Sequence, residues 1–369
     1  MMDHTTYLHP TQIFDGTALR KGYVTVASGH VTGLQDSIPA ETVPHLLQGT
    51  LTPGYLDLQV NGGGNVFLNT DPTGEGMAKI AAAHRCFGTV GILPTLITDA
   101  PEVLDRAADA SIAALGQPGI LGLHIEGPHL SLARRGTHSA RYLRPLDART
   151  IAVVRRLRDA GVPVMITVAP EAVAQGLIAQ LADMGAVVSI GHSDTNAAQA
   201  RAALAEGATC FTHLYNAMSP MLNRSAGVTG ACINSTAYAG IICDGIHVAD
   251  EMVVLALRAR PHPDTTFLVS DAMPTVGGSD RFSLYGDEIH LENGRLVNAE
   301  GSLAGAHTTM GESVARLISV VGIDPAQALR MATTIPAKVI GLPTGLIGQR
   351  VENLLLLDAN WNVQTIGLH

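Results

Sequence analysis

The stretch Ile120-Leu121-Gly122-Leu123-His124-Ile125-Glu126 is an apolar run that ends in a carboxylate. Three later apolar runs have the same form, and they lead to His192, His213 and Asp271. Short runs of this kind are typical of buried parallel strands. Because the carboxyl ends of parallel strands meet at one edge of a sheet, we expect these four polar side chains to lie close together.

Eight such strand candidates occur between residues 54 and 270. They cover residues 54–60, 90–95, 120–125, 163–168, 187–190, 210–212, 239–242 and 266–270. Helical patterns at 74–86, 101–115, 147–159, 171–184, 196–206 and 250–259 separate most of them. This alternation predicts a (β/α)₈ TIM-type barrel. A doubly wound open sheet is disfavoured, because Gly62-Gly63-Gly64 is not followed by a clear helix start.

Both ends of the chain show strand patterns without a helix pattern. Residues 7–51 are rich in strands and turns, and residues 353–357 and 362–366 form two further strand candidates. Segments at opposite ends of a chain can pair, so we predict a small β-sandwich domain from residues 1–51 and 342–369. The metal-dependent barrel domain, residues 52–341, is inserted between them. A length of 369 residues suits a barrel of about 250 residues with such a module.

Composition excludes several classes of partner. Hydrophobic residues make up 46% of the chain and charged residues 15%, and the net charge is −9. No basic run exceeds two residues, so we expect no nucleic-acid partner. No apolar run approaches the roughly 20 residues needed to span a bilayer, so we expect no membrane association. Four cysteines without paired spacing, and no signal-peptide pattern at the start, predict a cytoplasmic protein without disulfides.

The strand-end residues have the chemistry of a metal-dependent hydrolase. Glu126, His192 and His213 would give a divalent ion three protein ligands and leave a position open for water. Asp271 could take a proton from that water and return it to a leaving group. His138, on the loop after Glu126, is either an exposed loop residue or a hydrogen-bond donor to a developing oxyanion.

Several motifs resemble a known family. They are His-Ile-Glu-Gly-Pro-His-Leu at 124–130, Arg-Gly-Thr-His at 135–138, Gly-His-Ser at 191–193, Thr-His-Leu-Tyr-Asn-Ala-Met at 212–218, Asp-Gly-Ile-His at 244–247 and Ser-Asp-Ala at 270–272. In this order they resemble the N-acetylglucosamine-6-phosphate deacetylases of the amidohydrolase superfamily. The likeness extends to residues 52–57 and to the tail from 336 to 358.

The resemblance implies release of acetate from N-acetylglucosamine 6-phosphate in amino-sugar catabolism. It implies that Glu126, His192 and His213 hold one metal ion per chain, zinc first and iron or another divalent ion next. Asp271 would move protons and His138 would polarise the acetyl carbonyl. The implied sugar-phosphate site comprises Thr137, Asn216, Ala217, Arg224, Asp244, His247, Leu303, Ala304 and Gly305. Arg224 and His247 would face the phosphate, with Arg224 reaching across the interface of a homodimer.

The chain departs from the wider superfamily at the end of its first barrel strand. Many members carry His-x-His there, whereas this chain has Gln59-Val60-Asn61. The chain also has only three lysines, none at a barrel strand end, which excludes a bridging carbamylated lysine. We therefore expect a single metal, with Gln59 and Asn61 as remnants of a second, weak site.

Three alternatives stay open at this point. The first is a deacetylase of another N-acyl hexosamine phosphate, such as N-acetylgalactosamine 6-phosphate. The second is a cyclic-amide hydrolase, which needs the missing His-x-His. The third is an inactive barrel that acts as a sugar sensor, against which the intact polar residues argue.

Overall fold

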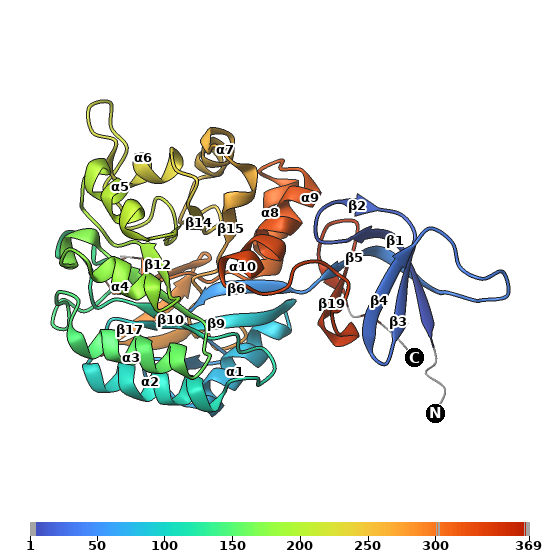
Figure 1. Ribbon diagram of the computed structural model, residues 1–369, viewed down its shortest axis with the longest axis horizontal. Coiled ribbons are helices and arrows are strands. Elements are labelled where there is room, and N and C mark those ends of the chain that lie inside the picture. Colours follow the sequence, from blue (N-terminus) through green and yellow to red (C-terminus); the bar gives the residue numbers. More distant parts are fainter. Residues whose placement is uncertain (1–4, 300, 302, 365, 367–369) are drawn as a thin grey trace.

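The computed structural model describes residues 5–299, 301, 303–364 and 366. A barrel surrounded by helices forms one part of the molecule, and a sheet built from both ends of the chain forms the other (Figure 1). In the described part, no helix is long and apolar enough to cross a bilayer.

The barrel contains eight parallel strands in the order β15-β14-β13-β12-β11-β10-β9-β6. These are β6 (Tyr55–Val60), β9 (Thr89–Ile97), β10 (Leu123–Glu126), β11 (Val164–Val168), β12 (Val187–Ile190), β13 (Cys210–Phe211), β14 (Tyr238–Ile241) and β15 (Thr266–Leu268). The first and last strands close the barrel, since Asp271 donates its backbone N–H to Gln59 at 2.9 Å and Asn61 donates to Ala272 at 2.9 Å. The predicted (β/α)₈ barrel is confirmed.

Helices follow the barrel strands. They are α1 (Gly74–Arg85), α2 (Pro101–Ala113), α3 (Ala148–Asp159), α4 (Leu177–Asp183), α5 (Ala197–Glu206), α6 (Gly227–Ile233), α7 (Asp250–Ala259), α8 (Met310–Ser319), α9 (Pro325–Ala332) and α10 (Thr334–Val339). Side-chain caps mark several of the starts, including Thr73, Asp147 and Asn196. The helix predicted at 171–184 is wrong in its first half: α4 begins only after Gly176, whose φ of 88° is outside the helical region.

A layer of buried hydroxyl groups lies one step below the strand ends. His124 Nδ1 is 3.0 Å from the Leu58 carbonyl, which can only accept, so Nε2 accepts from the Thr167 hydroxyl at 2.8 Å. Thr212 and Ser189 continue this chain at 2.7 Å each. His124 and Glu126 point to the same side of β10, because side chains alternate along a strand. The site above therefore rests on a layer whose hydrogen bonds are satisfied.

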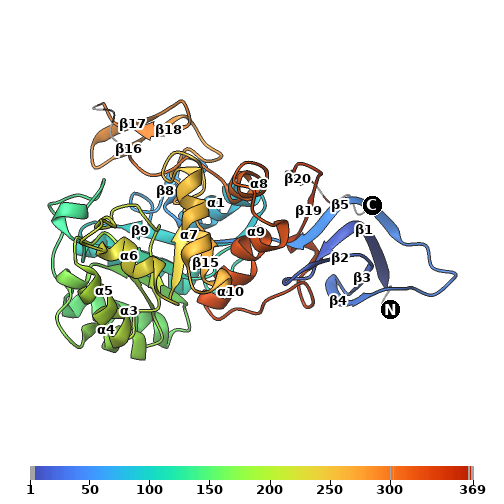
Figure 2. The same cartoon turned by 90° about the horizontal axis from the view of Figure 1, so that it is seen from above.

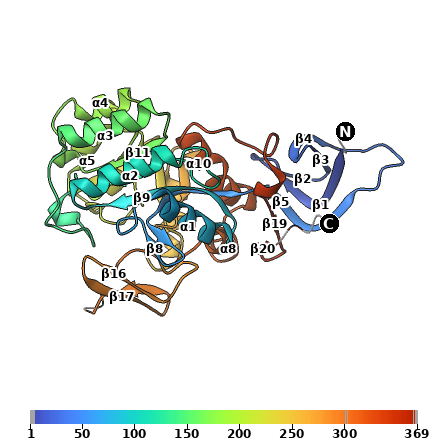
Figure 3. The ribbon, with the colours of Figure 1, turned by 90° about the horizontal axis from the view of Figure 1, so that it is seen from below.

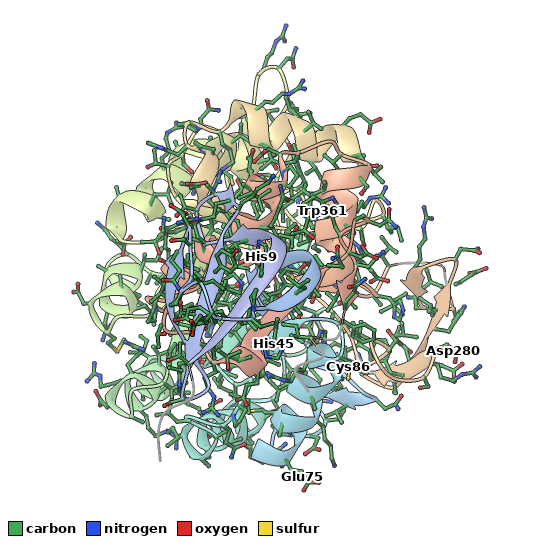
Figure 4. All side chains as sticks on the ribbon, turned by 90° about the vertical axis from the view of Figure 1, so that its right-hand side faces the viewer. His9, His45, Glu75, Cys86, Asp280 and Trp361 are labelled. Atoms are coloured by element: carbon green, nitrogen blue, oxygen red, sulfur yellow. The ribbon has the colours of Figure 1, made fainter. Side chains whose placement is uncertain are left out.

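The terminal segments form a single seven-stranded sheet in the order β20-β19-β5-β1-β3-β4, with β2 paired to β1. Its strands are β1 (Thr6–Phe14), β2 (Leu19–Arg20), β3 (Tyr23–Ala27), β4 (His30–Gln35), β5 (His45–Pro53), β19 (Leu354–Leu357) and β20 (Val363–Gln364). Pairing of β5 with β19 joins the two ends of the chain, as predicted. The predicted small β domain is therefore present, and its strands are joined in one hydrogen-bonded sheet, because β5 pairs with β1 on one side and with β19 on the other. Figure 4 views the molecule from this side, with His9 and His45 on the sheet.

The terminal sheet passes directly into the barrel, since β5 ends at Pro53 and β6 begins at Tyr55. Gly54 lies at this junction, where an added Cβ would be 2.3 Å from Val90 Cγ1. The predicted domain limits at residues 51 and 342 stay a proposal. The first of them falls inside β5. Residue 365 of the last predicted strand lies outside the described residues.

A three-stranded antiparallel sheet, which we did not predict, is inserted between β15 and α8. It consists of β16 (Arg281–Leu284), β17 (Asp287–Glu292) and β18 (Arg295–Val297). Figures 2 and 3 show it standing out from the barrel near β8 (Val66–Phe67), and Figure 4 shows Asp280 at its edge. Its inner side chains pack in a small cluster with Phe67, Ile97 and Met273. The sheet therefore covers the end of the barrel where the polar strand ends lie.

Candidate active site

Three polar side chains, at the ends of β10, β12 and β13, converge at the mouth of the barrel. Glu126 Oε1 is 3.3 Å from His192 Nε2 and 3.2 Å from His213 Nε2. The two ring nitrogens are 3.0 Å apart, and all three side chains are buried. Among the described residues, this is the one group of three metal-binding side chains with ligand atoms close enough to share an ion.

The protonation of His192 favours metal binding. Its Nδ1 lies 2.8 Å from the carbonyl oxygen of Arg134, which can only accept a hydrogen bond. Nδ1 therefore carries the proton and the lone pair of Nε2 faces Glu126 and His213. One carboxylate and two imidazoles that face a common point fit a divalent cation with an open position.

Backbone strain marks the same residues. His192, His213 and Asp271 have φ angles of 47°, 28° and 52°, in the left-handed region that non-glycine residues rarely adopt. Each of the three follows the end of its strand. Such strain persists only where the surrounding structure holds it, and it gathers at functional sites.

Asp271 is held by two amide side chains. Its Oδ1 accepts from Asn61 Nδ2 at 2.7 Å and from Gln59 Nε2 at 3.1 Å, and Gln59 also donates to Glu126 at 2.9 Å. Burial and then the Glu126 charge raise the pKa of Asp271 to about 6. A carboxyl group that titrates near neutral pH is suited to proton transfer. Gln59 and Asn61 thus contact the carboxylates through their N–H groups, and a second metal site there stays a proposal.

His138 presents a hydrogen-bond donor to the pocket. The backbone N–H of Thr98 points at His138 Nδ1 at 3.3 Å, so Nδ1 accepts and a neutral ring carries its proton on Nε2. Burial and then His192 lower the pKa of His138 to about 3, which keeps the ring neutral. Thr98 was not predicted, although it directly follows the end of β9 as the other site residues follow their strands.

A cavity of about 180 Å³ brings most of the predicted residues together. Its lining comprises Asn61, Ile97, Glu126, Gly136, Thr137, His138, His192, His213, Asn216, Ala217, His247, Asp271, Met273, Leu303 and Gly305. Ala304 lines a neighbouring cavity of about 430 Å³ that shares Gly136, Thr137 and Leu303. Ile97 and Met273 were missed, because apolar side chains in a site have no signal that separates them from the core.

Asp244 lies behind His247 and orients it. Its Oδ1 accepts the backbone N–H groups of Ile246 and His247 at 2.8 Å each, and its Oδ2 is 2.7 Å from His247 Nδ1. The ring therefore donates through Nδ1 and presents Nε2 to the cavity. Gly245, at φ 72°, leaves room for the Arg316 guanidinium, which an added Cβ would meet at 2.1 Å.

Arg224 lies apart from the pocket of its own chain. It belongs to the exposed segment 220–226 between β13 and α6, which projects from the barrel near α6 (Figure 1). Met221 and Leu222 on the same segment are 44% and 60% exposed. The structure thus brings together every other predicted site residue, directly or through a neighbour, but leaves Arg224 outside.

Comparison with known proteins assigns this arrangement to a family. Residues 50–349 match the model of the Amidohydrolase family. A relative named N-acetylgalactosamine-6-phosphate deacetylase, from Shewanella sp. (strain ANA-3), is 40% identical over 329 residues, which cover 87% of this chain and 83% of the relative. One named N-acetylglucosamine-6-phosphate deacetylase, from Haemophilus influenzae, is 33% identical over 327 residues, with 86% and 85% covered.

Solved structures agree with the sequence relatives. The N-acetylglucosamine-6-phosphate deacetylase of Pasteurella multocida superposes with a TM-score of 0.89 at 32% identity, covering 98% of this chain and 97% of that one. A mutant of the Mycobacterium smegmatis enzyme, in complex with N-acetyl-D-glucosamine-6-phosphate, gives a TM-score of 0.88 at 31% identity, with 97% and 96% covered. This chain therefore belongs to the amidohydrolase family.

Proposed function

We propose that this chain hydrolyses N-acetylglucosamine 6-phosphate to glucosamine 6-phosphate and acetate. One observation carries the proposal: Glu126, His192 and His213 converge beside Asp271 and His138 in a single cavity. The names of the relatives and the sugar phosphate bound to the Mycobacterium smegmatis enzyme support this choice of substrate. Four free cysteines support the cytoplasmic location that we also propose.

Glu126, His192 and His213 would hold one divalent ion. We propose zinc, because two imidazoles and a carboxylate are a common zinc ligand set, with iron as the alternative. When bound, the ion would supply positive charge that acidifies water and polarises the acetyl carbonyl. Gln59 keeps both Glu126 and Asp271 in place through its amide N–H group.

Asp271 and His138 would act on the amide bond from two sides. Asp271 accepts a proton as the water oxygen bonds to the acyl carbon, and returns it to the amine nitrogen as the C–N bond breaks. His138 donates from Nε2 to the acyl oxygen, where negative charge develops. One water proton passes through Asp271 to the amine nitrogen, and the hydroxide part of water becomes the acid group of acetic acid. That acid then loses the second water proton to the amine or to solvent, so the products are acetate and a protonated amine.

The phosphate end of the substrate would lie near His247, with Asn216 and Ala217 beside the sugar. We propose that Arg224 reaches the phosphate in the site of a second copy, in a homodimer. Its exposed position, outside the cavity of its own chain, supports this arrangement. A guanidinium matches phosphate in both charge and geometry.

A second candidate substrate is N-acetylgalactosamine 6-phosphate, because the relative at 40% identity carries that name. We would measure acetate release from both sugar phosphates and from their unphosphorylated forms, on protein of measured metal content. The proposal predicts the higher kcat/KM for the glucosamine derivative. A clear preference for the galactosamine derivative would show that N-acetylgalactosamine 6-phosphate is the substrate. No acetate release from either sugar phosphate would refute both candidates.

Metal stoichiometry follows from the ligand set. Purified protein should hold about one tightly bound divalent ion per chain, because the described residues contain one set of three good metal ligands. Replacement of His192 or His213 by Ala should empty the site in elemental analysis. His9→Ala, on the terminal sheet, is the matched control and should keep the ion. Two tight ions in the native protein, or full occupancy without either histidine, would contradict the ligand assignment.

Asp271→Asn should separate binding from catalysis. An amide keeps the size of the side chain but cannot accept a proton, so kcat should fall by several orders of magnitude, roughly 10³-fold or more. Metal content and substrate affinity should change little. A variant that turned over at near the native rate would reduce Asp271 to a structural role.

Arg224→Ala should weaken recognition of phosphate. KM for the phosphorylated sugar should rise by about 10-fold or more, with little change for the unphosphorylated sugar, because a charge-assisted contact is lost.

A mixed dimer of one Arg224→Ala chain and one Asp271→Asn chain tests whether Arg224 acts across the interface. If Arg224 acts across it, one site carries both defects and the other carries none, so activity returns. Inactive, verified mixed dimers would exclude this arrangement.

A further inference from the structure

Tyr285 joins the inserted sheet to the edge of the active site. It lies at the turn between β16 and β17 with a φ of 54°, and its hydroxyl donates to the carbonyl oxygen of Thr98. Tyr285 is 40% exposed and lines the cavity of about 430 Å³ beside the substrate pocket. The hydroxyl thus links the turn of the inserted sheet to the residue that follows β9. Figures 2 and 3 show this sheet standing out from the barrel near β8.

Thr98, the residue that Tyr285 contacts, also holds His138. Its backbone N–H lies 3.3 Å and its hydroxyl 2.8 Å from His138 Nδ1. Gly127 also packs closely against the Thr98 hydroxyl, since a Cβ added to Gly127 would be 2.2 Å from Thr98 Oγ1. The phenol therefore contacts the residue that holds the His138 ring.

The inserted sheet is attached at its base without Tyr285. Ser279 donates its backbone N–H and its hydroxyl to Asn65 Oδ1 at 2.6 and 2.8 Å. Phe282 packs on Phe67 with ring centroids 6.2 Å apart. Loss of the Tyr285 hydroxyl would thus leave the sheet in place and remove only the contact at its tip. The neighbouring cavity, lined by Gly136 and Thr137, would then give the loop before His138 room to shift.

We propose that Tyr285 is a positioning residue, which fixes Thr98 and thereby aims the Nε2–H of His138 at the acyl oxygen. The proposal rests on the proposed deacetylation, in which His138 meets the developing negative charge. Small displacements of such a donor have large effects on rate, because its alignment matters most in the transition state. Tyr285 itself takes no part in proton transfer.

Tyr285→Phe removes the hydroxyl and keeps the ring. We expect kcat to fall by about 10-fold, with KM within about twofold of the native value and with metal content and melting temperature unchanged. Tyr23→Phe is the matched control, because Tyr23 stacks on His9 in the terminal sheet far from the cavity lining. It should keep native activity. An unchanged kcat in Tyr285→Phe, or a change in KM alone, would overturn the positioning role.

A double-mutant cycle distinguishes positioning from a general effect on the fold. If Tyr285 acts only through His138, Tyr285→Phe should have no further effect on kcat in a His138→Asn background. The same 10-fold loss in both backgrounds would overturn the inference. Native protein inactive on both sugar phosphates would refute the proposed function, whereas active native protein with a native-like Tyr285→Phe variant would refute only this role.

Discussion

A buried carboxylate beside two imidazoles is the constraint on which the site depends. Glu126 lies buried at the mouth of the barrel, 3.2 and 3.3 Å from the ring nitrogens of His213 and His192. A charge in such a place must be paired, because burial without a partner costs several kcal/mol or more. The Glu126 carboxylate and the two Nε2 lone pairs can therefore face one another only if a proton or a cation lies between them. The amidohydrolase family is metal-dependent, and Glu126, His192 and His213 are the residues that could hold the ion.

Hydrogen bonds from the surrounding residues hold the side chains of the site in place. The hydroxyl groups of Thr167, Thr212 and Ser189 satisfy the polar interior below it. The carbonyl of Arg134 orients His192, and the amides of Gln59 and Asn61 hold Asp271. Such fixed dipoles need no rearrangement when charge develops on the substrate, which is how preorganised sites lower a barrier. Tyr285 would extend the same support to His138 from outside the barrel.

Much of this arrangement was predictable because the barrel repeats one local pattern. Each apolar run is a strand, and the polar residue that follows it points into one common mouth, which is how Glu126, His192, His213 and Asp271 were found. The first half of the helix predicted at 171–184 was wrong, because Gly176 adopts a φ of 88° that helix periodicity does not reveal. The three-stranded sheet was missed although Asn293-Gly294 is a hairpin signal between β17 and β18. The contacts of Thr98 and Tyr285 join residues 187 positions apart, which no local pattern encodes.

Anomalous diffraction from crystals of the zinc-loaded protein tests the central claim most directly, because it locates the ion independently of any activity. The account predicts one strong peak per chain, about 2.0–2.2 Å from Glu126 Oε1 and from the Nε2 atoms of His192 and His213. Gln59 and Asn61 should still hold Asp271 beside it. A peak that is not bound by all three of these ligands, or no peak in protein that retains full activity, would contradict the account.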